Sequence, residues 1–570
     1  MVQPGIFERA TGHNSEILDE WMPAALVRPF VFDDPGVIWL ERFGGQYGFE
    51  PDTGPYEFFD FIVDKGKEFE KKWLEQNAPD MVLVCNEPFE VRSANKLEQT
   101  ISLMTDNAPV IAQPALWWAP ESIYGVPDLI VHISWFETHF PSVYNGIRDS
   151  LHITPPKEGF YVALDLKFTS KLEGAEKAQD LENYACQIRI YNYILGHIQE
   201  FMPPKAYIIT RDMLFNPINV DNRSVLGEPL DSDLGEFRDS YTDIRINGAK
   251  YTPWDDEKVK INLSHEDERW VTAKKRIANE YIHGRDSVLL YQVGQVTKAQ
   301  LASLGFDSLD SLLAAEPNDI PFERCVNIGK IKGNRMRAII KANKTGQPVV
   351  AFKQPILPKK RFEFFVDYEY FNNINVDFDS QWPTLQGCEM IFMIGVGMES
   401  EQLWSFRSFI ARCEHHDQEK EIIEEFSQYL QELTGGMLRD KNETALYHWS
   451  DPEVWQSRNA GERHNIPQNH PFLNLPWVDL EKTFLNGPCA IPGAWRYRLK
   501  DIAKALGKLD QSFDPHWPGD LDEGKRAMIM GWRMYGGDDP FSSYEMQTLI
   551  DYLEADCKAL WLILKWLRSQ

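Results

Sequence analysis

The feature that most constrains the fold is a pair of opposite charges inside an apolar run. Residues 160–167 read Phe-Tyr-Val-Ala-Leu-Asp-Leu-Lys, a composition typical of a buried strand. Side chains alternate along a strand, so Asp165 and Lys167 point to the same face. A core tolerates charges only when they are paired or bind a metal ion. The run therefore indicates either an ion pair in a surface hairpin or one wall of a buried polar site.

A second acid, Asp128, follows Pro127 at the start of another apolar run. If the two runs are neighbouring strands, Asp128 and Asp165 meet at one edge of a sheet. Two carboxylates favour a hard divalent cation such as Mg²⁺ or Mn²⁺, because these ions prefer oxygen ligands. Such a metal would activate water, and Lys167 would stabilise the developing negative charge.

The segment after Lys167 narrows the alternatives. Residues 184–195 have a helical pattern, and Gln187 and Tyr191 are four residues apart on one face. The order Pro-Asp, Asp-x-Lys and Gln-x-x-x-Tyr resembles the RecB-like branch of the PD-(D/E)xK nucleases. The resemblance implies that Gln187 and Tyr191 orient the nucleic-acid strand and the Lys167 side of the site. It also implies an upstream metal ligand on a helix, which here is Glu70, shortly after Gly66.

Length and composition are those of a globular protein with several domains. The chain has 570 residues, of which 43% are hydrophobic and 25% charged. We expect two to four domains. No apolar run is long enough to span a bilayer, so we expect no membrane partner and a cytoplasmic location. The seven cysteines are dispersed without a C-x-x-C pair, which favours reduced thiols over an iron–sulfur cluster.

The net charge of −27 conceals a local basic stretch. Residues 321–361 contain eleven Lys and Arg but one acid, Glu323. Glycine turns before predicted helices in this region resemble helix–hairpin–helix modules, because a helix that follows such a turn offers free backbone N–H groups to a phosphate. A solvated basic face is the alternative. The predicted nucleic-acid-binding residues are Lys330, Lys332, Arg335 and Arg337.

A second acidic site is predicted beyond residue 358. Asp367 and Glu369 share one face of a predicted strand, and Tyr552 and Asp556 share one face of the last helix. An Asp-x-Glu strand followed by a terminal Tyr-x-x-x-Asp helix resembles the DEDD exonucleases of the RNase H-like fold. The resemblance implies two metal ions, a fourth acidic ligand and a tyrosine that orients or deprotonates water. Glu453 is the favoured fourth ligand, with Asp451 and then Asp479 as alternatives.

These observations predict an α/β multidomain chain. The expected segments are a RecB-like PD-(D/E)xK domain of restriction-endonuclease-like fold at 1–212, an acidic connector at 213–265, an all-α helix–hairpin–helix-like segment at 266–350 and an RNase H-like domain at 358–570. Within the first domain, the stretch before residue 55 is expected to be irregular, and residues 81–91 and 99–105 are expected to be strands.

The function predicted from the sequence is metal-dependent hydrolysis of DNA, at single strands or ends, in repair, recombination or defence. One alternative is an RNA 3′–5′ exonuclease driven by the C-terminal domain. Another is a nucleic-acid-binding scaffold whose nuclease sites have decayed. A Gly-x-x-x-x-Gly-Lys-Ser/Thr motif is absent, so a helicase motor would be a separate partner.

Overall fold

The computed structural model describes residues 5–52, 57–170, 178–219, 230–265, 269–281, 287–351, 357–385, 387–400, 403–518, 524–536 and 540–570. The chain divides into two compact units. Unit 1 comprises Met1–Ile282 and Phe378–Leu385, and unit 2 comprises His283–Asp377 and Gln386–Gln570.

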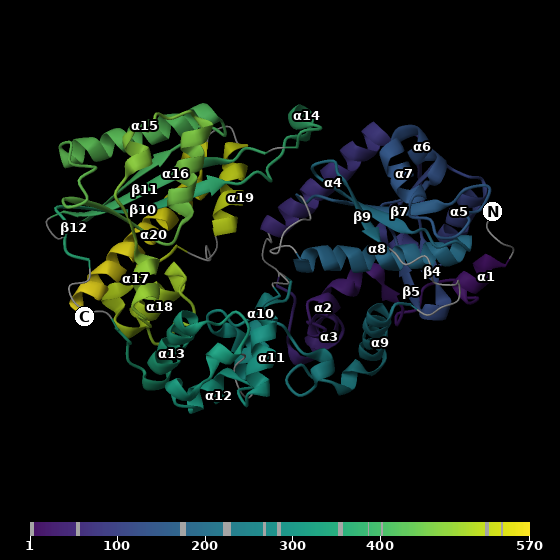
Figure 1. Cartoon of the computed structure of the whole chain (residues 1–570), viewed down its shortest axis with the longest axis horizontal. Coiled ribbons are helices and arrows are strands. Elements are labelled where there is room, and N and C mark those ends of the chain that lie inside the picture. Colours follow the sequence, from purple (N-terminus) through teal and green to yellow (C-terminus); the bar gives the residue numbers. More distant parts are fainter. Residues whose placement is uncertain are drawn as a thin grey trace. The chain divides into compact units, whose positions relative to one another are not determined.

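Unit 1 is built on a six-stranded mixed sheet of order β2-β3-β6-β7-β8-β9 (Figure 1). β6 is antiparallel to both β3 and β7, whereas β7 and β8 are parallel and are connected through helix α8. A smaller sheet has the order β1-β5-β4. The strands of unit 1 are β1 (Met22–Pro23), β2 (Val82–Leu83), β3 (Val110–Ala112), β4 (Leu116–Trp118), β5 (Ile123–Gly125), β6 (Leu129–His132), β7 (Tyr161–Lys167), β8 (Lys205–Thr210) and β9 (Phe215–Asn219).

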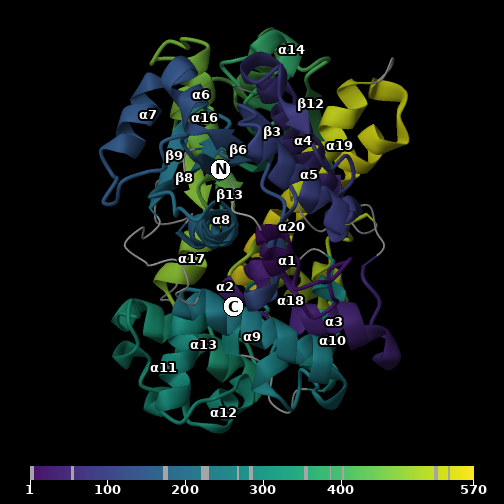
Figure 2. The same ribbon diagram turned by 90° about the vertical axis from the view of Figure 1, so that its right-hand side faces the viewer.

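Helix α8 packs against β7 and β8 and supplies buried side chains such as Ile188 and Leu195 to the core. Helices α6 and α7 pack against each other beside the larger sheet (Figure 2). The helices of this unit are α1 (Ile6–Thr11), α2 (Arg28–Val31), α3 (Gly36–Phe43), α4 (Glu57–Asn77), α5 (Ala94–Thr105), α6 (Ile133–His139), α7 (Pro141–Arg148), α8 (Ala178–Gln199), α9 (Ser232–Asn247), α10 (Val271–Glu280) and α14 (Phe378–Gln381).

Several local expectations differ from this structure. The strand expected at 99–105 is wrong, because these residues belong to helix α5, whose buried Leu97, Thr100 and Met104 follow the three-to-four-residue spacing of a helix face. The strand expected at 81–91 is reduced to β2, and a 3₁₀ turn follows it. The stretch before residue 55 is not irregular throughout, since it contains α1, α2 and α3.

The acidic segment after residue 212 also contains regular structure. Asp231 caps helix α9 by accepting a hydrogen bond from the backbone N–H of Asp233, and Tyr241 and Ile244 are buried along the helix. The buried apolar residues of α9 thus belong to a helix, although acidic residues dominate the composition of the segment. Contacts group residues 213–265 with unit 1.

Unit 2 contains a five-stranded sheet of order β12-β11-β10-β13-β14 (Figure 1). β10, β11 and β12 form antiparallel pairs, whereas β13 is parallel to both β10 and β14. The strand predicted to carry Asp367 and Glu369 is confirmed as β10 (Phe362–Phe371). The other strands of the sheet are β11 (Met390–Ser400), β12 (Leu403–Ile410), β13 (Thr444–His448) and β14 (Trp477–Asp479).

The long helix α20 packs against β10 and β11, and α15 packs against β11 and β12. The close approach of α20 requires Gly395 on β11, because a Cβ atom there would lie 2.7 Å from Cγ of Leu553. The helices of unit 2 are α11 (Gln295–Ser303), α12 (Leu309–Ala314), α13 (Lys330–Thr345), α15 (His416–Thr434), α16 (Pro452–Arg463), α17 (Leu480–Asn486), α18 (Leu499–Leu509), α19 (Gly524–Tyr535) and α20 (Tyr544–Ser569).

The basic helix α13 is anchored within unit 2. Nε of Arg335 donates a 2.7 Å hydrogen bond to the carbonyl of Leu485, and the backbone of Val349 forms an isolated β-bridge with Ala490. The helical segment around α11–α13 is therefore held against the region that follows β14. In the described part of the chain, no helix has the length and apolar character needed to cross a membrane.

Candidate functional sites in the two units

The charged pair on β7 lies at the sheet edge where β6 begins. Asp165 is 2% exposed, and its Oδ2 lies 2.7 Å from Nζ of Lys167. β6 runs antiparallel to β7, which brings Asp128 beside the end of that strand. Oδ2 of Asp128 accepts a 2.6 Å hydrogen bond from the backbone N–H of Leu166. The structure thus brings together the three residues of the Pro-Asp and Asp-x-Lys motifs.

The third acid, Glu70, joins this group through a glutamine that the sequence did not reveal. Nε2 of Gln113 lies 2.8 Å from Oε1 of Glu70 and 3.3 Å from Oδ1 of Asp128. Burial raises the pKa of Glu70, and the charge of Asp165 adds to this effect. Burial also raises the pKa of Asp128 well above its usual range, reinforced by the charges of Asp165 and Glu70. The three acids therefore form one interacting group.

Helix α8 places the two remaining predicted residues beside the pair. Nε2 of Gln187 donates a 2.8 Å hydrogen bond to the hydroxyl of Tyr191, which is 2% exposed. Burial raises the pKa of Tyr191, and the charge of Asp165 raises it further. Burial alone would lower the pKa of Lys167, but the charges of Asp165, Asp128 and Tyr191 and the hydrogen bond to Asp165 together outweigh it, so the net direction is upward. The tyrosine remains neutral and the lysine charged at physiological pH.

Gly125 explains why the tyrosine ring can lie so close to this edge. A Cβ atom on Gly125 would be 2.3 Å from Cε1 of Tyr191 and 3.1 Å from Cβ of Ala24. The glycine of the Gly-Val-Pro-Asp sequence is thus required by side-chain packing at the site.

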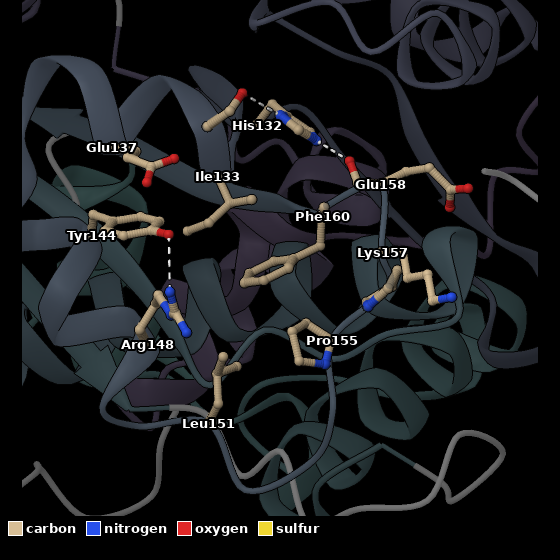
Figure 3. A pocket seen from close by; sticks show the side chains of 13 residues that line it. His132, Ile133, Glu137, Tyr144, Arg148, Leu151, Pro155, Lys157, Glu158 and Phe160 are labelled. Carbon is tan, nitrogen blue, oxygen red and sulfur yellow. Dashed lines mark hydrogen bonds between the residues drawn. The ribbon is translucent and has the colours of Figure 1, made fainter.

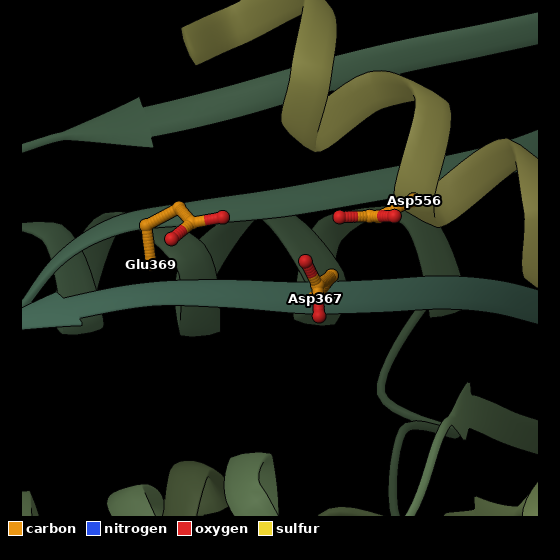
Figure 4. Close-up of side chains that lie close together, drawn as sticks. All are labelled: Asp367, Glu369 and Asp556. Atoms are coloured by element: carbon orange, nitrogen blue, oxygen red, sulfur yellow. The ribbon is translucent and has the colours of Figure 1, made fainter. Parts of the chain in front are cut away.

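Three acids converge in unit 2. Asp367 and Glu369 extend from one face of β10, and Asp556 extends toward them from α20 (Figure 4). One ligand oxygen from each lies within 4.8 Å of the other two. Burial raises the pKa of Asp367 and of Glu369 well above their usual ranges, and the neighbouring carboxylates add to both shifts. Among the described residues, this cluster alone brings together three such ligand atoms so closely.

The residues present fit a hard divalent cation. All of the donors are carboxylates, which such ions prefer, and their close mutual approach is unfavourable without positive charge. A regular alternation along β10 places Asp367 and Glu369 on one face, and the register of β10 with β11 shifts directly after Glu369. The irregularity in the pairing of β10 with β11 therefore lies directly beside the two acids.

Glu453 is the fourth acid that the structure places at this cluster. It lies in the first turn of α16, is 4% exposed and forms a side-chain hydrogen bond with Asp367. Burial raises the pKa of Glu453 to about 8, although its hydrogen bond with Asp367 acts in the opposite direction. Oε2 of Glu453 also lies 3.2 Å from Nδ1 of His448, a buried residue at the end of β13 that the sequence did not single out.

The two alternative acids have other interactions. The side chain of Asp451 is exposed, and its Oδ1 lies 2.8 Å from Nζ of Lys482. Asp479 caps α17 by accepting a hydrogen bond from the backbone N–H of Lys482, and its Oδ2 lies 3.0 Å from Nζ of the same residue. The geometry therefore favours Glu453 over both.

Tyr552 is held between a cation and an acid. Nζ of Lys500 donates a 2.7 Å hydrogen bond to the hydroxyl of Tyr552, which in turn hydrogen-bonds to Asp556. Nε1 of Trp517 donates a 2.8 Å hydrogen bond to Oδ1 of Asp556. Burial raises the pKa of Tyr552, and the charge of Asp556 raises it further. Lys500 and Trp517 belong to no motif that sequence reasoning identified.

The predicted basic residues of α13 are divided between solvent and internal contacts. Lys330 is exposed and Lys332 is half-buried. Arg335 hydrogen-bonds to a backbone carbonyl, as described above, and Arg337 forms a bidentate ion pair with Glu323. Two of the four predicted residues thus stabilise the fold of this segment.

A family match covers the C-terminal part of the chain. Residues 383–568 match the RNase H superfamily. The match includes Glu453, Tyr552 and Asp556 and begins after β10, which carries Asp367 and Glu369. The C-terminal domain is therefore RNase H-like, which implies a nuclease-type enzyme, and nucleases of this superfamily usually use divalent metals. No curated protein and no solved structure matches the chain.

Unit 1 also contains a cavity of about 300 Å³, lined in part by residues of α6 and α7 (Figure 3). His132 at its wall contacts the hydroxyl of Ser134 through Nδ1 at 2.7 Å and the carbonyl of Glu158 through Nε2 at 3.0 Å. Both ring nitrogens are thus engaged by the protein. The cavity contains none of the predicted site residues.

Proposed function

We propose that the protein is a nuclease that hydrolyses phosphodiester bonds of DNA with Mg²⁺ or Mn²⁺ and prefers single strands or ends. The observation that carries this proposal is the carboxylate cluster of Asp367, Glu369 and Asp556 within the RNase H-like domain. Glu453 completes the ligand set from α16.

Bound divalent ions would supply Lewis-acid activation of water and neutralisation of phosphoryl charge. In the net reaction, the water oxygen bonds to phosphorus and the bond from phosphorus to the leaving oxygen breaks. The water releases a proton to solvent, and the leaving oxygen acquires one. Tyr552 keeps its proton because its pKa is raised, so its role is to orient the water rather than to deprotonate it.

We also propose that unit 1 contains a second site of the RecB-like PD-(D/E)xK type. Support comes from the strand order β3-β6-β7-β8, with α8 between two parallel strands, and from the meeting of Glu70, Asp128 and Asp165 beside Lys167. In this proposal the acids hold a metal ion, while Lys167 stabilises negative charge on the phosphoryl oxygens. Gln187 and Tyr191 position the substrate strand.

The segment α11–α13 is proposed to bind the nucleic-acid backbone as a helix–hairpin–helix module. Both α11 and α13 begin directly after a glycine in extended conformation, Gly294 and Gly329, without a side-chain cap on the first N–H groups. Lys330 and Lys332 lie in the first turn of α13 and add positive charge there. Contacts of this kind position a strand without reading its sequence.

The test is a cleavage assay on labelled single- and double-stranded DNA and RNA with Mg²⁺, Mn²⁺ or EDTA. It compares the wild type with Lys167→Ala and Asp367→Ala, each with a matched exposed control, Lys71→Ala and Glu425→Gln. Loss of DNA cleavage in Asp367→Ala alone assigns the chemistry to the RNase H-like domain, and loss in Lys167→Ala alone assigns it to unit 1.

Cleavage of RNA but not DNA would replace the proposed substrate with RNA. If no substrate is cut while DNA is still bound, the isolated chain is a binding scaffold and the nuclease proposal is wrong.

A further inference from the structure

Lys500 is connected to the acids of unit 2 through Tyr552, which hydrogen-bonds to both Lys500 and Asp556. Lys500 is the second residue of α18, a helix that packs against α20 and in which Ile502 and Leu506 are buried. Its Nζ is 2.7 Å from the hydroxyl of Tyr552 and 4.1 Å from the centre of that ring. The ammonium is therefore fixed by both a hydrogen bond and a cation–π contact.

The charge of Lys500 acts on the whole cluster. It opposes the effect of burial on the pKa of Asp367, of Glu369 and of Asp556. Buried carboxylates need a compensating charge, and the ammonium of Lys500 is linked to the cluster by its hydrogen bond to Tyr552, which in turn hydrogen-bonds to Asp556.

The ammonium of Lys500 and a bound divalent ion would compensate the same negative charge. Two cations near one cluster repel each other, so each weakens the other's interaction with the acids. A lysine ammonium is a compact charge on a flexible four-carbon stem, and it can turn from one partner to another without movement of the backbone. The neighbouring Trp517 ring, 5.8 Å from Nζ, lies within reach of the same stem.

We propose that Lys500 compensates the acidic cluster when no metal is bound and, once divalent ions occupy the cluster, binds a non-bridging oxygen of the substrate phosphate. Tyr552 is the residue against which the ammonium is held in the first state. This inference rests on the proposed nuclease function of the RNase H-like domain, since the phosphate is that of its substrate.

The proposal predicts that one substitution changes metal binding and catalysis in opposite directions. Lys500→Met keeps the apolar stem but removes the charge, so the affinity of the cluster for Mn²⁺ should increase by about tenfold. Cleavage under single-turnover conditions should slow by about 10- to 100-fold, and the apparent Kd for single-stranded DNA should rise, because the phosphate loses a charged partner. A lysine with a purely structural role would weaken both metal binding and cleavage.

The experiment measures Mn²⁺ binding by calorimetry and single-turnover cleavage for the wild type, Lys500→Met, Lys500→Arg and Lys508→Met. Lys508 is exposed on the same helix, so its variant should behave like the wild type. Lys500→Arg keeps the charge and should retain the wild-type affinity for Mn²⁺ with part of the activity.

Unchanged or weaker Mn²⁺ binding by Lys500→Met would overturn the proposal. Tighter Mn²⁺ binding together with undiminished cleavage would also overturn it, because the ammonium would then have no role toward the phosphate. Calorimetry does not depend on turnover. If the wild type binds Mn²⁺ and cuts no nucleic acid, the nuclease function fails, while the comparison of affinities still shows whether Lys500 compensates the cluster.

Discussion

The ammonium of Lys167 lies 2.7 Å from Oδ2 of Asp165, two residues earlier on the same strand. Asp165 is almost completely buried, whereas the lysine side chain retains 22% of its exposure. The lysine is therefore the more solvent-accessible member of the pair.

The first prediction concerns the stability of this pair. Lys167→Met leaves the Asp165 carboxylate buried without its cation and should destabilise unit 1 by about 3 kcal/mol, the low end for a broken buried pair because the lysine is partly exposed. The double variant Asp165→Asn/Lys167→Met should recover part of this loss. Hydrogen exchange of peptides from β7 and β8 measures both the loss of stability in Lys167→Met and its partial recovery in the double variant. Equal protection in Lys167→Met and the wild type would contradict the prediction.

A second prediction follows from the contact between Gly125 and Tyr191. Gly125→Ala places a methyl group 2.3 Å from the tyrosine ring, which must move. We expect a loss of about 1–3 kcal/mol in the stability of unit 1 and a loss of cleavage assigned to that unit. The control is Gly146→Ala in helix α7, where no atom lies within 4 Å of the added carbon and alanine is the better helix former. Comparable thermal shifts in the two variants would argue against the packing explanation.

Sequence patterns were sufficient to identify side chains that share one element. Asp165 and Lys167 lie on one face of β7, and Asp367 and Glu369 lie on one face of β10. Tyr552 and Asp556 are four residues apart, about one turn of α20. Periodicity determines the face on which such residues lie, whatever the rest of the chain does. The match of residues 383–568 to the RNase H superfamily confirms the fold expected for that domain.

Residues that enter a site from a distant element could not be found in this way. Gln113 meets Glu70 across 43 positions of sequence, and Lys500 meets Tyr552 across 52. Neither belongs to a local pattern, since each depends on how whole elements pack. The sequence of α5 shows a related limit: the β-branched Thr100 and Ile101 favour a strand locally, but the burial of Leu97 and Met104 on one side decides for a helix.

A third prediction is a pH dependence of stability that arises from Glu453. Its pKa is raised to about 8 in the folded protein, so the native state keeps a proton that the unfolded chain loses above its ordinary value of 4.5. The native state then binds more protons, and stability falls as pH rises from about 4.5 to 8. Each pKa unit corresponds to about 1.4 kcal/mol, which gives a total of a few kcal/mol for the metal-free protein.

Thermal unfolding in EDTA between pH 5 and 8 measures this effect. Glu453→Gln should flatten the fall of Tm with pH, and Glu425→Gln, an exposed acid on α15, should leave it as in the wild type. Identical slopes for wild type and Glu453→Gln would mean that the proton is not held at this residue.

The last prediction is that divalent metal stabilises unit 2 through Asp367. A ligand that binds only the native state adds about 2.7 kcal/mol at a concentration one hundred times its Kd. Mn²⁺ should therefore slow hydrogen exchange in peptides of β10 and α20 in the wild type and in Glu425→Gln. Asp367→Asn removes a central carboxylate from the group whose ligand atoms lie within 4.8 Å of each other, so this protection should disappear while any effect of Mn²⁺ on β7 of unit 1 persists. If Mn²⁺ protects β10 equally in Asp367→Asn, the ion binds elsewhere in the unit, and the three acids must owe their proximity to the fold alone.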